Sequence, residues 1–144
     1  MPKRVLFLCA TDPSRGQMAE ALMRQLGGEC FVVASACTYP SRRLHPGLVA
    51  TLARNRVSTD GLVSNDVAIL AAQSFDYVIA LCDHAHEQCP PLAGADKIHW
   101  RFPNPTGIAD VPTRNRAFED LFQGLANRIR LLIIVNEHAG RAES

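Results

Sequence analysis

Apolar residues in this chain occur in short continuous runs and in stretches where they recur every three or four positions. The continuous runs are six or seven residues long and carry many aliphatic or aromatic side chains, which predicts β-strands. These strands are expected at residues 4–9, 30–36, 75–81 and 97–102. Because the first two runs do not alternate with polar residues, we expect them to be buried on both faces of a sheet.

Between these runs lie stretches in which apolar residues recur at helical spacing. Helices are predicted at residues 17–26, 45–54 and 65–73, and a longer one starts near Thr113. Gly27 and Gly28 end the first helix, and Pro46 lies early in the second, where its missing N–H costs little. The last helix carries one apolar stripe that should face the core, made of Phe118, Leu121, Phe122, Leu125, Ile129 and Leu132.

Strands that alternate with helices predict an α/β fold. We expect a three-layer sandwich in which helices cover both faces of a four-stranded parallel sheet. The whole chain, residues 1–144, is interpreted as one domain of this kind. Ligands of such folds bind at the carboxyl ends of the strands, where this prediction places Cys9 and Cys82.

Composition narrows the range of partners. The chain is 47% hydrophobic and 20% charged, with a formal net charge of +1, which is typical of a folded protein and favours neither nucleic acid nor an anionic membrane as partner. No apolar stretch approaches the roughly 18 residues of a spanning helix, and the N-terminus does not resemble a signal peptide. We therefore expect a cytoplasmic protein. Its five cysteines, an odd number, favour reduced thiols over a disulfide framework.

The first chemical motif joins the first strand to the first helix. Cys9 ends the strand, and Arg15 follows six residues later at the start of the helix. Backbone N–H groups and the helix dipole at such a place can bind an oxyanion and lower a thiol pKa, and an arginine can hold two oxygens at once. The candidate oxyanion-binding loop comprises Cys9, Ala10, Thr11, Asp12, Pro13, Ser14, Arg15 and Gly16. The alternative is a buried structural cysteine beside a surface arginine.

A second motif follows the third strand. Cys82 and Cys89 lie seven positions apart in a polar segment, too far apart for a disulfide along an intact helix but within reach if the segment loops or unwinds. Such a pair suits thiol–disulfide exchange. A zinc site formed by this pair with His84 and His86 is a second interpretation, and two ordinary cysteines with solvated histidines a third.

These motifs resemble those of the thioredoxin-coupled arsenate reductases, within the low-molecular-weight tyrosine phosphatase superfamily. The resemblance covers nearly the whole chain and is carried by Cys9-x5-Arg15, residues 17–20, Ser35-Ala36, His45-Pro46, residues 76–79, Cys82-x6-Cys89-Pro90 and His99-Trp100-x-Phe102-x-x-Pro105. The last two motifs are typical of the reductase branch.

The resemblance implies a relay of three thiols. Cys9 attacks arsenate held by Arg15, Cys82 attacks the Cys9 sulfur and releases arsenite, and Cys89 then attacks Cys82. The implied partners are arsenate or a phosphate-like oxyanion, and thioredoxin, glutaredoxin or a mycothiol system as the electron donor. Cys30 is expected to be a buried strand residue. Cys37 stands where the family usually has glycine, and no role is assigned to it.

Several residues depart from the family pattern. The family loop usually reads Cys-Thr-Gly-Asn-Ser-Cys-Arg-Ser, so that Asp12 adds a charge, Pro13 removes a backbone donor and Gly16 removes a hydroxyl. Asn104 stands where the family has its general acid, and an amide cannot exchange a proton as a carboxyl can. Besides arsenate reduction, two functions therefore remain open: a phosphatase or other oxyanion enzyme, and a non-catalytic descendant that binds an oxyanion or a protein.

The resemblance also implies a cation site, although no tightly bound cofactor is expected. Some members hold a potassium ion beside the loop, and the matching positions here are Asp12, Glu20, Ser35 and Asn65. Asn and Asp have exchanged places, which keeps both carboxylates. The alternative role of Asp12 is to cap the start of the helix.

Overall fold

The fold is organised around a parallel sheet of five strands. A computed structural model describes residues 2–41, 43–70, 72–89 and 94–143, and in it the strand order is β3-β2-β1-β4-β5. The strands are β1 (Lys3–Cys9), β2 (Phe31–Cys37), β3 (Asn65–Asp66), β4 (Tyr77–Ala80) and β5 (Asp96–His99). The predicted parallel sheet is confirmed, with a short fifth strand at its edge that the sequence did not indicate.

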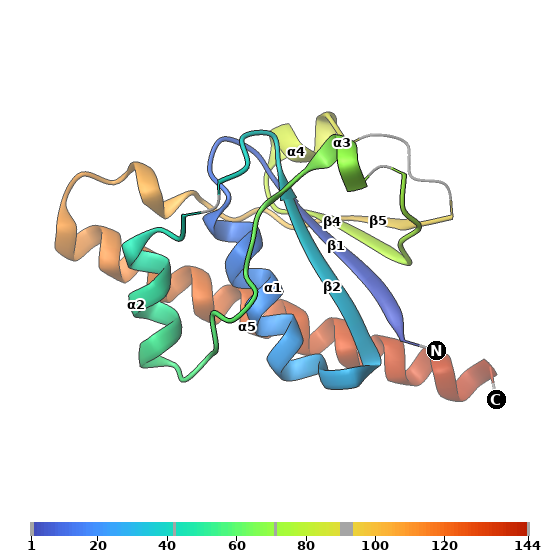
Figure 1. The fold of residues 1–144 in the computed structure, drawn as a ribbon. Coiled ribbons are helices and arrows are strands. Elements are labelled where there is room, and N and C mark those ends of the chain that lie inside the picture. Colours follow the sequence, from blue (N-terminus) through green and yellow to red (C-terminus); the bar gives the residue numbers. More distant parts are fainter. Residues whose placement is uncertain (1, 42, 71, 90–93, 144) are drawn as a thin grey trace.

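Helices cover both faces of the sheet, which confirms the three-layer prediction (Figure 1). The helices are α1 (Ser14–Gly27), α2 (Pro46–Arg54), α3 (Val67–Leu70), α4 (Asp83–Glu87) and α5 (Val111–Glu143), with 3-10 turns η1 (Gly28–Cys30) and η2 (Pro105–Gly107). Figure 1 shows α1, α2 and α5 on one side of the sheet and α3 and α4 on the other. No helix among the described residues combines the length and apolarity needed to cross a bilayer.

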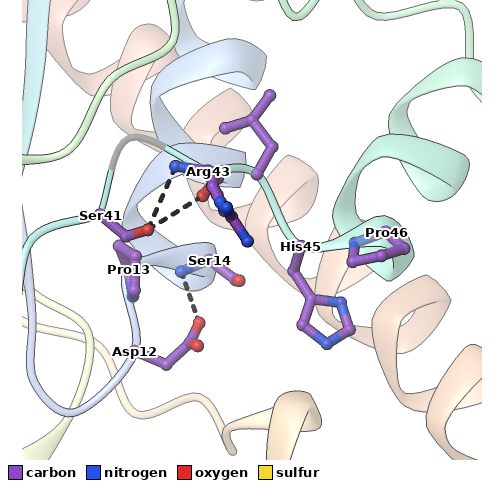
Figure 2. A pocket seen from close by; sticks show the side chains of 8 residues that line it. Asp12, Pro13, Ser14, Ser41, Arg43, His45 and Pro46 are labelled. Atoms are coloured by element: carbon purple, nitrogen blue, oxygen red, sulfur yellow. Dashed lines mark hydrogen bonds between the residues drawn. The ribbon is translucent and has the colours of Figure 1, made fainter.

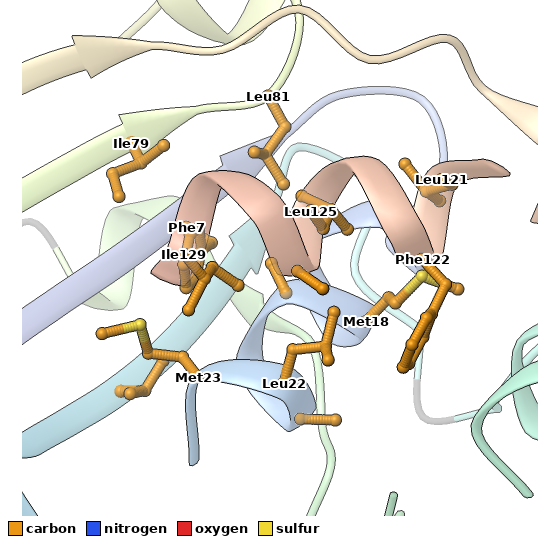
Figure 3. Close-up of a cluster of buried hydrophobic side chains, with 14 of the residues drawn as sticks. Phe7, Met18, Leu22, Met23, Ile79, Leu81, Leu121, Phe122, Leu125 and Ile129 are labelled. Carbon is orange, nitrogen blue, oxygen red and sulfur yellow. The ribbon is translucent and has the colours of Figure 1, made fainter. Parts of the chain in front are cut away.

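The larger core lies between the sheet and the pair α1 and α5 (Figure 3). Phe7 and Ile79 from the sheet meet Met18 from α1 and Leu125 and Ile129 from α5, all with no exposed surface. The stripe predicted on the last helix is thus confirmed as core. A smaller apolar cluster lies on the opposite face, where its members include Leu6, Leu8, Ala10, Ala36, Val78, Ala80 and Ala85.

The structure corrects two predicted segments. Residues 65–73 were expected to form a helix, but the chain first pairs with β2, through Asn65 with Ala36 and Asp66 with Cys37, and only then forms the one-turn helix α3. Cys30 was expected to be buried in a strand, and this is wrong. It ends η1 and is exposed, because β2 begins one residue later and extends to Cys37.

Candidate functional site

The candidate site lies at the carboxyl edge of the sheet. Cys9 ends β1, the loop after it turns into α1 at Ser14, and Cys37 ends the neighbouring strand β2. Cys9 and Cys37 are direct partners in the parallel register of these strands. Both residues are almost fully buried, with exposed fractions of 2% and 0%. The site thus contains Cys37 beside Cys9, a thiol to which the sequence analysis assigned no role.

The loop after Cys9 uses part of the predicted set of backbone donors for bonds within the protein. The N–H of Asp12 donates to the carbonyl of Ala10 at 2.8 Å, the N–H of Ser14 donates to the Asp12 carboxylate at 2.8 Å, and Pro13 has no N–H. Thr11 adopts a φ of 67°, a left-handed conformation that a β-branched residue rarely takes. The Asp12 carboxylate therefore accepts a donor that an oxyanion would otherwise use.

Arg15 also bonds within the protein. Its side chain is buried, and its guanidinium donates to the carbonyls of Ala10 at 3.0 Å and Phe102 at 2.9 Å. The Nε atom has no hydrogen-bond partner among the described residues. These two bonds tie the loop to the segment after β5. Both must be replaced by contacts with the anion if Arg15 is to hold an oxyanion.

A cleft of about 370 Å³ borders the outer side of this loop. Asp12, Pro13 and Ser14 line it on one side, and Arg43 and His45 lie across from them (Figure 2). In Figure 2 the Asp12 side chain turns back toward the start of α1 to accept the Ser14 N–H. An anion that enters the cleft would meet an acidic group and a basic group at its entrance.

Each of the two buried thiols shifts the pKa of the other. A hydrogen bond from the Cys9 thiol, with help from the Tyr39 N–H and the positive charge of Arg15, lowers the pKa of Cys37 to about 7, against the opposing effects of burial and Asp12. The same bond and burial raise the pKa of Cys9 well above its ordinary value, although the Gly16 N–H and Arg15 act in the opposite direction. A second charge beside the first would be repelled, so the pair carries at most one thiolate near neutral pH.

Cys82 and Cys89 lie at the same edge of the sheet as Cys9, but their side chains pack on the opposite face of the sheet from α1 and α5. Both are half-buried and pack against the smaller core cluster, the one under α4. The Cys82 sulfur accepts the Ala85 N–H at 3.4 Å and so caps α4. Cys89 follows α4 and, with Cys9, lines a narrow cavity at the sheet edge. The three predicted relay thiols thus gather at one edge, where Cys89 shares a cavity with Cys9. Pro90 of the motif lies outside the described residues.

Comparison with known proteins identifies the family. The sequence profile of the low molecular weight phosphotyrosine protein phosphatases matches residues 4–133. The chain belongs to this family.

Members with described activities are also similar to the chain. It is 31% identical over 107 residues to the glutaredoxin arsenate reductase of Synechocystis, covering 73% of this chain and 80% of that protein, and 29% identical over 106 residues to an arsenate reductase of Bacillus cereus, covering 73% and 78%. A solved structure described as an arsenate reductase in the phosphate binding state is 26% identical, with a TM-score of 0.77 over 92% of this chain and 97% of that one.

Asn104, which the resemblance placed at the position of the general acid, acts as a cap. Its side-chain oxygen accepts the N–H and the hydroxyl of Thr106, at 3.1 and 2.8 Å, at the start of η2. A group that accepts two hydrogen bonds in this way is held as an acceptor, and an amide has no acidic proton to give.

The residues that match the potassium site assemble only in part. Ser35 donates to the Glu20 carboxylate at 2.9 Å, and Asn65 donates to the Ser35 carbonyl at 3.0 Å. Glu20 also forms a salt bridge with Arg24, whose guanidinium supplies the positive charge that a potassium ion would bring. Asp12 bonds to Ser14 instead. This set does not fit a cation, and no step of the chemistry below uses one.

The zinc interpretation of the second cysteine motif is not supported. The described residues contain no group of three or more His, Cys, Asp or Glu side chains placed to hold a metal. His84 is exposed, and His86 stacks on His99 with ring centroids 4.2 Å apart.

Sequence reasoning missed Cys37 as a residue of the site. The sequence did contain an indication of this role, because Cys37 directly follows a predicted buried strand and such a residue lies at the same sheet edge as Cys9. The prediction ended this strand at residue 36, one position early, and the register that pairs the two cysteines appears only in the fold.

Proposed function

We propose that this protein reduces arsenate to arsenite with Cys9 as the nucleophile, and that Cys82 and Cys89 pass the resulting disulfide to a small redox protein. Family membership and the arsenate reductases among its relatives support this function. The observation that carries it is the thiol of Cys9 at the end of β1, beside the Gly16 N–H and Arg15 of α1 and close to further thiols.

In the first step the Cys9 thiolate attacks arsenic. An S–As bond forms, one arsenate oxygen leaves as water, and the Cys9 proton is taken up by the neighbouring Cys37 thiolate or by the leaving oxygen. In the second step another thiol attacks the Cys9 sulfur. The S–As bond breaks, arsenic keeps its electron pair and leaves as arsenite, and the two sulfurs have lost the two electrons that arsenic gained.

Binding of the oxyanion requires the loop to rearrange. The Ser14 N–H would leave the Asp12 carboxylate, and the Arg15 guanidinium would turn from the Ala10 and Phe102 carbonyls toward the anion. In this proposal Asp12 occupies the place of the substrate's charge in the resting loop. Binding therefore exchanges one carboxylate for the anion at the same backbone donor.

The disulfide leaves the site through the segment that carries α4. Cys89 already lines the cavity that Cys9 borders, and α4 is only five residues long, so little structure is lost if Cys82 is released from its capping role. Regeneration needs a dithiol donor, and we place the reaction in the cytoplasm, where thioredoxin and glutaredoxin systems keep thiols reduced.

The test measures arsenite formed from arsenate with thioredoxin, its reductase and NADPH, and in parallel with glutathione and glutaredoxin. We expect turnover with at least one donor, loss of it in Cys9→Ser, and full activity in the matched control Cys30→Ser, which removes an exposed thiol. Absence of arsenite with every donor, or a Cys9→Ser variant as active as the unchanged protein, would refute the proposal. Hydrolysis of a phosphate ester, measured separately, should be weak because Asn104 cannot act as the acid.

A further inference from the structure

The two faces of the sheet separate the thiols at the site into two pairs. Cys9 and Cys37 point into the core under α1 and α5, whereas Cys82 and Cys89 pack against the cluster under α4. A thiol from the second pair must therefore move around the edge of the sheet to reach the Cys9 sulfur. Cys37 needs no such movement, because its strand lies directly beside that of Cys9.

The distance between these strands suits a disulfide. Register partners in neighbouring strands lie about 4.7–4.9 Å apart in the hydrogen-bonding direction, within the roughly 4.4–6.8 Å that separates the Cα atoms of bonded cysteines. The two sulfurs are close enough for each to shift the pKa of the other, and the Cys9 thiol donates to the carbonyl of Ala36, the residue before Cys37, at 3.9 Å. Gly16 closes the other side, where an added Cβ would come within 3.2 Å of the Cys9 sulfur.

Cys82, in contrast, has a structural role in the fold. Its sulfur accepts the Ala85 N–H, and α4 must lose this cap before Cys82 can act as a nucleophile. Cys37 caps no helix in the part of the chain that the structure describes, and the Tyr39 N–H, which helps to lower its pKa, does not depend on the Cys9 proton.

We propose that Cys37 is a further catalytic residue, the thiol that attacks the Cys9 sulfur and expels arsenite, so that the first disulfide of the cycle joins Cys9 to Cys37. This inference rests on the proposed function and changes its second step.

The step balances within the site. Cys37, which holds the proton released by Cys9 in the first step, passes it to an oxygen of the departing arsenite as its sulfur attacks. The S–As bond breaks, an S–S bond forms, two thiols are oxidised and As(V) becomes As(III). The Cys82 and Cys89 thiols then reduce this disulfide by exchange and carry it to the redox protein.

The test is a single turnover of the Cys82→Ser/Cys89→Ser double variant, reduced, freed of reductant and mixed with arsenate. If Cys37 resolves the adduct, this variant still releases one arsenite per chain. Peptide mapping after an alkylating quench should then find Cys9 bonded to Cys37. If Cys82 is the resolving thiol, the variant releases none, and the inference is overturned while the unchanged protein remains active.

A second variant tests the same step by removing Cys37 and keeping the other thiols. Cys37→Ser, in an otherwise unchanged chain, should slow single-turnover arsenite release by about 100-fold or more, because an adjacent nucleophile is lost. Cys30→Ser is the matched control and should leave the rate unchanged. Wild-type rates in a folded Cys37→Ser variant would overturn the inference. If that variant does not fold, the double variant decides alone, since it keeps Cys37. An unchanged protein that forms no arsenite with any donor refutes the proposed function and, with it, the role of Cys37.

Discussion

The Asp12 carboxylate should weaken anion binding, and its removal measures by how much. Asp12→Asn keeps an oxygen that can accept the Ser14 N–H but removes the charge. Two unit charges about 4 Å apart interact by about 1 kcal/mol in water and about 4 kcal/mol in protein-like surroundings. Because Asp12 is half-buried and lines the cleft, we expect about 1–2 kcal/mol per unit of anion charge. This corresponds to about 5- to 30-fold tighter binding of a monoanion.

Asp12→Ala goes one step further, because it also frees the Ser14 N–H. A hydrogen bond to a charged group is worth about 1.5–3 kcal/mol, so binding should tighten by about another 10- to 150-fold. The cost is the lost bond at the start of α1, about 1 kcal/mol of stability. Isothermal titration calorimetry with phosphate and arsenate at constant ionic strength measures both effects.

The matched control is Asp110→Asn, an exposed carboxylate that accepts the Thr113 N–H at 3.1 Å at the start of α5. It removes the same charge from a helix start outside the loop and should leave anion affinity unchanged within about twofold. If Asp12→Asn and Asp12→Ala both bind anions as the unchanged protein does, Asp12 does not compete with the ligand. If Asp110→Asn tightens binding equally, net charge is the cause, and the interpretation of the loop is wrong.

Three further predictions concern packing, ions and pH. Gly47→Ala places a Cβ 2.4 Å from the Phe118 ring and should lower the free energy of unfolding by about 1–3 kcal/mol in urea, and an unchanged midpoint would contradict this packing. Replacing potassium with tetramethylammonium chloride should not change the melting temperature, because Arg24 already neutralises Glu20; a clear shift would restore the cation site. Ultraviolet thiolate absorbance should rise as the pH increases through about 7, since below this pH both thiols are protonated, and Cys37→Ser should remove that step.

Much of the architecture was determined by local sequence pattern. The uninterrupted apolar residues of β1 are sufficient to predict a buried strand. The helical period of the stripe from Phe118 to Leu132 is likewise sufficient to predict a helix that faces the core, because both patterns depend on neighbouring residues alone. The position of Cys9 at a strand end before a helix follows in the same way. The sequence by itself therefore determined the layers, the edge of the sheet that carries chemistry, and the family.

Only the tertiary structure decided how the residues at that edge meet. The pairing of Cys9 with Cys37 depends on a register between strands 28 positions apart in sequence, which no local pattern encodes. The separation of Cys37 from Cys82 and Cys89 by the sheet likewise depends on which face each chain segment covers. The capture of the Ser14 N–H by Asp12 and of Glu20 by Arg24 reflects competition among alternative partners, and only their arrangement in space settles it.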